Sequence, residues 1–140
     1  YKENKMSLKN MIIQSKTAWI EYPGLKDFEV QLAYLTKDEL MKIKNKATSN
    51  KLNRKTRQME EEVDSDYFQQ LYVEAVLKDW RGLKYKYLNH LVPSDISGVE
   101  EEDELPFTQE DAKILMDNSV DFDGFISASL EDIENFTRSS

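Results

Sequence analysis

The most regular pattern of hydrophobic and polar positions lies in residues 28–34, where every even position is apolar or aromatic. A period of two is typical of a half-buried β-strand. Residues 16–22 read as another strand, and Pro23-Gly24 lies between the two as a turn pair. We therefore expect an antiparallel hairpin within about residues 10–35, which residues 10–14 could extend as a third strand.

Further along the chain, apolar residues recur at spacings of three and four, which indicates amphipathic helices. Thr36 and Glu39 have the spacing of a capping box at the start of the first helix. Thr108 is a candidate cap for a later one. The predicted helices cover about residues 37–48, 62–81, 108–117 and 121–135.

The helix predicted for residues 62–81 has the broadest apolar face. Gly82 follows it at the position where a glycine in the left-handed conformation commonly ends a helix. Trp80 would then lie in the last turn and pack across the core, because large aromatic side chains are mostly buried. We assign both residues structural roles.

Strands precede helices along the chain, which predicts the α+β class: a hairpin or small sheet packed against about four helices. The length of 140 residues predicts a single domain. Residues 48–58 lack periodicity and read as a mobile basic connection, whereas residues 94–105 read as an acidic loop. The stretch "KYKYLNHLVP" at residues 84–93 could pair briefly as a strand.

Composition narrows the class of protein. The chain is 39% hydrophobic and 33% charged, has no cysteine, and contains no apolar run of the roughly 18 residues that a membrane helix needs. The first ten residues include four charged side chains and no apolar stretch, so no signal peptide is expected. A soluble cytoplasmic protein without disulfides or thiolate metal sites is the expectation.

The net charge of -8 is distributed unevenly. Residues 37–57 contain eight basic residues against two acidic ones, and residues 99–140 contain thirteen acidic residues against two basic ones. The two regions could attract each other or two differently charged partners. The basic region has no interleaved aromatics and no base-reading motif, so nucleic acid is not expected as a partner.

No motif points to catalysis or to a cofactor. "DFDGF" at residues 121–125 resembles part of a calcium loop, but Ser119 and Leu130 stand where the first and last carboxylates are needed. His90 has no recognisable nucleophile or orienting acid near it in sequence. The paired acidic residues suit a solvated surface better than a glycosidase pair. We therefore expect no enzyme activity, metal or cofactor.

Four stretches resemble a known family by their order: "TAWIEYPGLKDFEVQLAYLTKDELMKI", "VEAVLKDWRGL", "ELPFTQEDAKILM" and "FDGFISASLEDIENF". They span roughly residues 18–136 and are similar to the tail assembly chaperones of long-tailed bacteriophages. That family shows a Trp-Phe-Glu hairpin, a Trp-x-Gly-Leu helix end and a Glu-Asn-Phe near the C-terminus. Residues 84–103 are longer than the turn that the family usually has there, and the family offers no invariant site residues to transfer.

The resemblance implies a small non-enzymatic helper in the bacterial host cytoplasm, often made in a short and a frameshift-extended form. Such a helper binds the tape measure protein and keeps it soluble while tail tube subunits assemble. The tail tube protein and a second copy of the chain are further candidate partners. Two alternatives are a structural virion protein, either a tail tube or a head-tail connector subunit, and a nucleic-acid-associated regulator.

The sequence also suggests where a partner could dock. The last two predicted helices and their flanks are rich in Phe and other large apolar side chains, which are enriched at interfaces that accept varied helices. These side chains could equally close the core. The candidate partner-binding residues are Phe107, Leu115, Met116, Phe122, Phe125, Ile126, Leu130 and Phe136.

Overall fold

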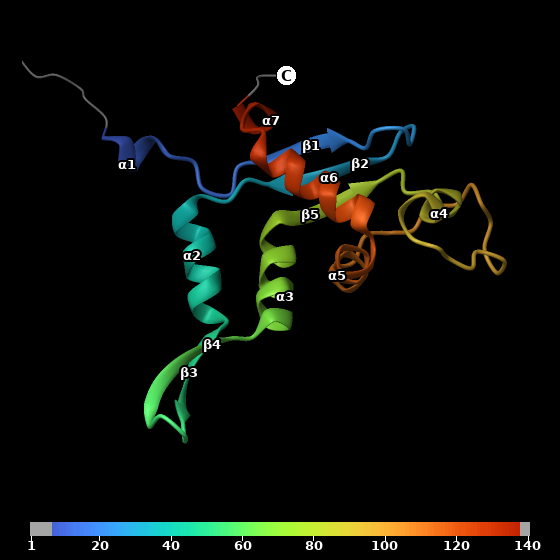
Figure 1. The fold of residues 1–140 in the computed structure, drawn as a ribbon. Coiled ribbons are helices and arrows are strands. Elements are labelled where there is room, and N and C mark those ends of the chain that lie inside the picture. Colours follow the sequence, from blue (N-terminus) through green and yellow to red (C-terminus); the bar gives the residue numbers. More distant parts are fainter. Residues whose placement is uncertain (1–6, 138–140) are drawn as a thin grey trace, which may run out of the picture.

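The computed structural model describes residues 7–137 and contains two antiparallel sheets (Figure 1). The main sheet has the strand order β1-β2-β5, and the second sheet is a two-stranded hairpin of β3 and β4. The strands are β1 (Thr17–Glu21), β2 (Glu29–Ala33), β3 (Thr48–Asn53), β4 (Gln58–Val63) and β5 (Leu77–Arg81).

Helices account for a larger part of the described chain than strands, so the predicted α+β class is confirmed. In Figure 1, α6 crosses one face of the main sheet, and α2 and α3 run side by side toward the projecting β3–β4 hairpin. The helices are α1 (Leu8–Met11), α2 (Lys37–Lys46), α3 (Ser65–Val76), α4 (Leu88–Leu91), α5 (Gln109–Asn118), α6 (Val120–Glu131) and α7 (Glu134–Thr137).

The predicted hairpin forms from β1 and β2. Gly24 has φ 82°, and the Tyr22 N–H donates a 2.9 Å hydrogen bond to the Phe28 carbonyl, which closes the loop. Val30 and Leu32 are fully buried, while Gln31 between them faces the other side of the sheet. The third strand predicted at residues 10–14 is not formed. Residues 8–11 are helical instead, and the third strand of the sheet is β5.

The basic stretch at residues 48–58, predicted to be mobile, forms strand β3 and the turn that follows it. Strand β3 pairs with β4 in a β-hairpin in which Thr48 lies opposite Val63. Its turn is fixed locally, because the Asn53 side chain accepts hydrogen bonds from the backbone of Lys55 and Thr56. A cross-strand ion pair between Lys51 and Glu62, at 2.8 Å, links the strands. The sequence prediction missed this hairpin because its strands are mostly polar, and their apolar residues Leu52, Met59 and Val63 are too few to show a period of two.

The helix predicted for residues 62–81 is also wrong in its extent. Asp64 caps α3, which ends at Val76, and residues 77–81 form strand β5. Trp80 therefore lies in a strand and not in the last turn of a helix. Leu77 and Trp80 are three residues apart, a spacing that fits a helix and not a regular strand. An irregularity in the β2–β5 register places them opposite the buried Leu32 and Val30, so both are buried on the core face. Pairing with β2 favours the strand because it completes the sheet's backbone hydrogen bonds.

Gly82 has the expected left-handed conformation, with φ 75°, but it follows a strand. A Cβ atom at this position would lie 1.9 Å from the carbonyl oxygen of Asp27 in the β1–β2 loop. The residue is therefore needed for a close approach of two backbones as well as for its φ angle. This approach places the end of β5 directly against the hairpin.

Residues 84–93 do not form the predicted strand. Residues 85–87 form a short 3-10 helix that continues into α4, and only an isolated bridge between Lys84 and Glu104 is strand-like. The acidic loop at residues 94–105 folds back over this region. Its Glu102 carboxylate forms ion pairs with both Lys84 and Lys86.

The last two long helices both begin at a side-chain cap; Thr108 is the cap that the sequence predicts, whereas Ser119 is not predicted, and α6 begins at Val120, one residue before the expected start. The Thr108 side chain accepts from the Asp111 N–H at 3.0 Å, and the buried Ser119 does the same for Phe122. The helix predicted for residues 121–135 ends earlier in the structure. Helix α6 ends at Glu131, and residues 134–137 form the separate short helix α7.

The core is one apolar cluster on one face of the main sheet. It combines side chains from β2 and β5 with side chains from α3, α5 and α6. Its fully buried large members are Phe28, Val30, Leu32, Val73, Val76, Leu77, Leu83, Phe122 and Ile126.

Candidate partner-binding groove

An apolar groove lies between α5 and the segment that follows α4, with a volume of about 370 Å³. Trp80 forms part of its lining, and Asp111, Ser94 and Asn118 are its polar members. Apolar lining with few polar groups is the usual composition of a site that binds an apolar partner. The apolar lining residues are Trp80, Leu88, Val92, Pro93, Leu105, Ile114 and Leu115.

The Trp80 side of the groove is held by strand β5 and the chain that returns toward α5. The Leu105 N–H donates to the Leu83 carbonyl at 2.8 Å, which aligns this return with the end of β5. The Trp80 indole then donates to the Leu105 carbonyl at 2.9 Å. Phe107 packs edge-on against the Trp80 ring with centroids 4.9 Å apart. These contacts tie this side of the groove to the core.

The opposite wall is held by two hydrogen bonds, one buried and one exposed. The Ser119 hydroxyl donates to the Leu91 carbonyl at 2.6 Å, which joins the end of α4 to the junction of α5 and α6. The Asn89 side chain accepts from the Ser94 N–H at 2.8 Å and fixes the turn after α4. The positions of Val92 and Pro93 are therefore set by hydrogen bonds on both sides of them.

Ile114 is the exposed apolar side chain at the rim of this groove. It lies on α5 and is 51% exposed. The same side chain also lines a second groove, of about 410 Å³, between α3 and α5. A partner that covers Ile114 would thus contact both grooves at once.

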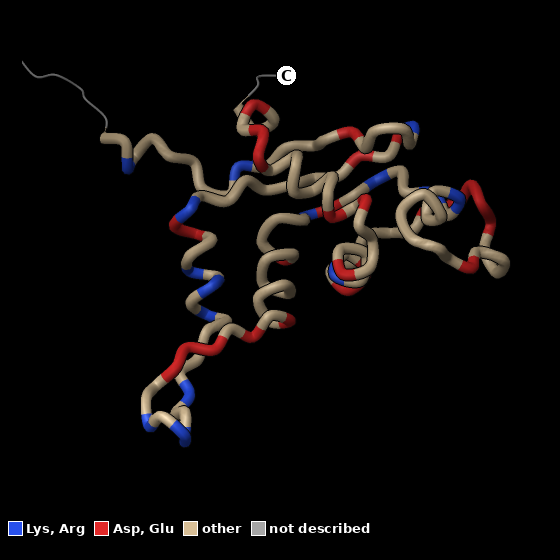
Figure 2. Tube along the Cα trace, viewed as in Figure 1, with Lys and Arg blue, Asp and Glu red and all other residues tan. Residues whose placement is uncertain are grey.

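Acidic residues surround Ile114. Asp111 borders the first groove, and Glu74, Glu110 and Asp117 border the second. Lys113 is the basic residue of the second lining, and it is paired with Asp66 and Asp117 at 2.7 Å each. The hydrogen bonds that its ammonium group donates to Asp117 and Asp66 raise the pKa of Lys113. The lining of the two grooves together carries an excess of negative charge, as does the loop at residues 100–104 that leads to Leu105 (Figure 2).

Most of the eight predicted partner-binding residues are not at the surface. Leu115, Met116, Phe122, Ile126 and Phe136 are buried in the core, and Phe107, Phe125 and Leu130 pack against it half-buried. Phe125, for example, lies with its ring centroid 4.4 Å from that of Tyr22. Of the eight, only Leu115 lines the groove described above.

Sequence reasoning did not single out Ile114, Leu88 or Val92 as candidates. Ile114 stands next to the apolar stripe of α5, which consists of Ala112, Leu115 and Met116. The sequence did contain a signal for Ile114: it is a large apolar side chain that lies outside the stripe that packs α5 on the core. Leu88 and Val92 gave no such signal, since their stretch read as a strand.

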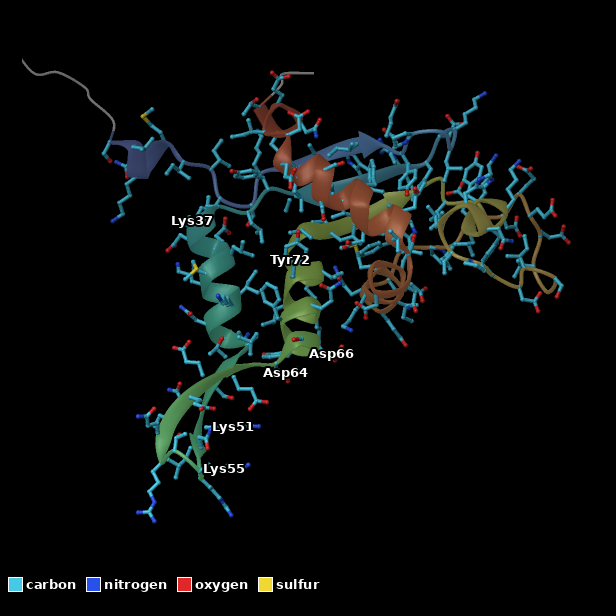
Figure 3. All side chains as sticks on the ribbon, viewed as in Figure 1. Lys37, Lys51, Lys55, Asp64, Asp66 and Tyr72 are labelled. Atoms are coloured by element: carbon cyan, nitrogen blue, oxygen red, sulfur yellow. The ribbon has the colours of Figure 1, made fainter. Side chains whose placement is uncertain are left out.

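The basic residues that sequence analysis noted lie on α2 and on the β3–β4 hairpin, and none of them lines the two grooves. Lys55 and its neighbours Arg54 and Arg57 lie at the tip of the β3–β4 hairpin, which projects away from the main sheet (Figure 3). Lys51 lies along this hairpin and is paired with Glu62. The strand β4 is acidic from Glu60 to Glu62, so the hairpin is not a continuous cationic surface.

The remaining sequence candidates are the "DFDGF" stretch and His90. The "DFDGF" stretch is helical, with Asp121 and Asp123 in the first turn of α6, so it does not wind around an ion. His90 is exposed on α4. Within residues 7–137 there is no group of three or more His, Asp or Glu side chains placed to hold a metal ion. Over the same residues, no helix is both long and apolar enough to cross a membrane.

Comparison with known proteins gives one family. Residues 36–140 match the profile of a family described as YdaY prophage protein, and this range is 105 of the 140 residues. The match begins at the capping residue of α2 and includes every element that lines the two grooves. Comparisons with curated proteins and with solved structures gave no significant match.

Proposed function

Because this chain belongs to the YdaY prophage protein family, we propose that it acts in phage assembly as a non-enzymatic tail assembly chaperone. In this proposal it binds the tape measure protein in the bacterial host and keeps it soluble while tail tube subunits assemble. The order of sequence motifs that resembles the tail assembly chaperones supports the finer assignment. The observation that carries the proposal is the apolar groove beside Ile114, with its acidic border.

The groove suits a helix with an apolar stripe. A tape measure protein is expected to be long and helical, and its apolar stripe would promote aggregation before assembly. A helix that lays such a stripe into an apolar groove is a recurring mode of recognition. Ile114, exposed between two grooves, is in position to be covered by such a helix.

Charge gives the proposed helix a second property. The carboxylates of Asp111, Glu110 and Asp117 flank Ile114 on α5. A helix with Lys or Arg beside its apolar stripe would be attracted to this surface and oriented on it. A helix with acidic flanks would be repelled, so the groove favours basic segments of the tape measure protein.

The test is co-expression with the tape measure protein encoded in the same prophage. We expect the tape measure protein to be soluble, and to co-purify, only when this chain is present. Finished phage particles should then lack the chain. A tape measure protein whose solubility does not respond to the chain would refute the proposal. Stoichiometric amounts of the chain in purified particles would instead identify a structural virion protein.

A further inference from the structure

Residues 8–13 present an apolar surface that the described chain leaves exposed. Leu8 is 70% exposed, Met11 55% and Ile13 62%, and Ile12 is exposed as well. Leu8, Met11 and Ile12 have the i, i+3, i+4 spacing of one helix face, and α1 spans Leu8–Met11. The segment therefore has the pattern of an amphipathic helix without a surface to pack on.

The direction of this segment is fixed where it joins the sheet. Ser15 has φ 54°, a left-handed conformation that turns the chain between α1 and β1. Its hydroxyl donates a 2.9 Å hydrogen bond to the Glu39 carboxylate on α2. In Figure 1, α1 accordingly projects away from the main sheet on the side of α2, and the α4–α5 region lies at the other end of the molecule.

The segment and the groove beside Ile114 are complementary in both apolar character and charge. Residues 7–16 contain Lys9 and Lys16 and no acidic residue. The groove has apolar walls and borders Asp111, and the acidic loop at residues 100–104 leads into it. The segment thus has the features proposed above for the tape measure helix, namely an apolar stripe with basic flanks.

We infer that residues 8–13 of one copy of this chain dock in the groove beside Ile114 of a second copy. Helix α4, whose Leu88 lines the groove, lies at the opposite end of the molecule from α1 in Figure 1, so a second copy is the matching acceptor. This inference rests on the proposed function, because it makes the second copy a temporary occupant of the partner groove. The occupant protects the groove until a tape measure helix displaces it.

The small size of the segment sets the strength of this contact. Six residues cover much less area than the surface of about 800 Å² per partner in a stable protein interface. The self-association should therefore be weak and dependent on concentration. A longer tape measure helix, which can cover Ile114 and both grooves, should displace the segment by competition.

Sedimentation of the full chain over a range of concentrations tests the inference. We expect the mean mass to rise above that of a monomer with increasing concentration. The triple variant Leu8→Gln, Met11→Gln, Ile12→Gln and the single variant Ile114→Gln should each stay monomeric. Val120→Gln, which changes a side chain that is 91% exposed on α6 outside the groove, should associate like the unmodified chain.

A labelled peptide with the sequence of residues 7–16, SLKNMIIQSK, supplies the second measurement. It should bind the triple variant, whose groove is intact, and bind Ile114→Gln at least tenfold more weakly. Association of the unmodified chain that persists in the triple variant would overturn the inference. A monomeric chain at all concentrations would also overturn it.

The two proposals can fail separately. If the tape measure protein depends on Ile114 but the peptide does not bind, the proposed function stands and this inference is wrong. If the peptide binds at Ile114 but the tape measure protein does not depend on the chain, the groove is a self-association site and the proposed function is wrong.

Discussion

The indole N–H of Trp80 donates a 2.9 Å hydrogen bond to the backbone carbonyl of Leu105, 25 residues further along the chain. This bond joins the last strand of the main sheet to the segment that leads into α5. Both residues line the groove beside Ile114, so the core contact and the groove share the same side chain.

Replacing Trp80 should destabilise the protein strongly. Trp80 is 4% exposed, and Trp80→Ala removes a core side chain, so we expect the free energy of unfolding to fall by about 3–5 kcal/mol. Trp19→Ala is the matched control. Trp19 is half-buried on the other face of the sheet under the Arg81 guanidinium, so its replacement should lower the free energy of unfolding by less. Denaturant unfolding measures both. An unchanged stability with lost partner binding would make Trp80 an interface residue instead.

Two glycines with positive φ should respond differently to alanine. Gly24→Ala should cost roughly 1–2 kcal/mol, the usual penalty of the left-handed conformation, because its Cβ would meet no atom within 4 Å. Gly82→Ala should cost clearly more, since its Cβ would also clash with the Asp27 carbonyl. Thermal unfolding of the two variants compares them. Equal losses of stability would mean that the backbone approach at Gly82 relaxes freely.

Calcium should leave the melting temperature unchanged. A ligand that binds only the folded state must raise the melting temperature by mass action. Because Asp121 and Asp123 lie in a helical turn, they do not surround an ion. A calorimetric scan with and without calcium at millimolar concentration checks this, and magnesium serves as the control ion. A clear rise with calcium alone would contradict the account.

Alkaline pH should destabilise the fold through Tyr22. Burial, together with the hydrogen bond that its hydroxyl donates to Asp121, raises the pKa of Tyr22 well above the ordinary 10.0. The unfolded chain therefore loses this proton first, and the stability that Tyr22 contributes is complete below pH 10 and declines above it. Tyr22→Phe should be less stable at neutral pH and should show a smaller decline between roughly pH 9 and pH 11. Tyr67→Phe, which changes a half-buried tyrosine on α3, is the control. An identical decline in all three proteins would refute this assignment.

The sequence was most informative where one local signal decided the structure. Thr36 and Thr108 cap α2 and α5 as their spacing predicts, since a cap needs only its own turn. Val30 and Leu32 are buried as their alternation predicts. The α+β class follows from the order of these local elements.

Prediction failed where distant pairing decided the structure. Residues 77–81 form a strand because they pair with the free edge of β2. The local sequence of residues 77–81 contains no sign of that distant partner. The candidate site shifted for a similar reason. Of the Phe side chains that looked available for a partner, Phe122 and Phe136 are buried in the core, and Phe107 and Phe125 pack against it half-buried. Ile114 is left outside because Leu115 and Met116 already close α5 against that core.

The central claim is that the groove beside Ile114 holds the tape measure protein. Its most direct test is the amount of soluble tape measure protein recovered on co-expression with the unmodified chain, with Ile114→Gln, and with Val120→Gln. Glutamine keeps the helix propensity and the charge of α5 but removes the exposed apolar side chain. We expect Ile114→Gln to remain folded and to lose most of the soluble tape measure protein, while Val120→Gln recovers as much as the unmodified chain. Equal recovery with Ile114→Gln and Val120→Gln would contradict the claim.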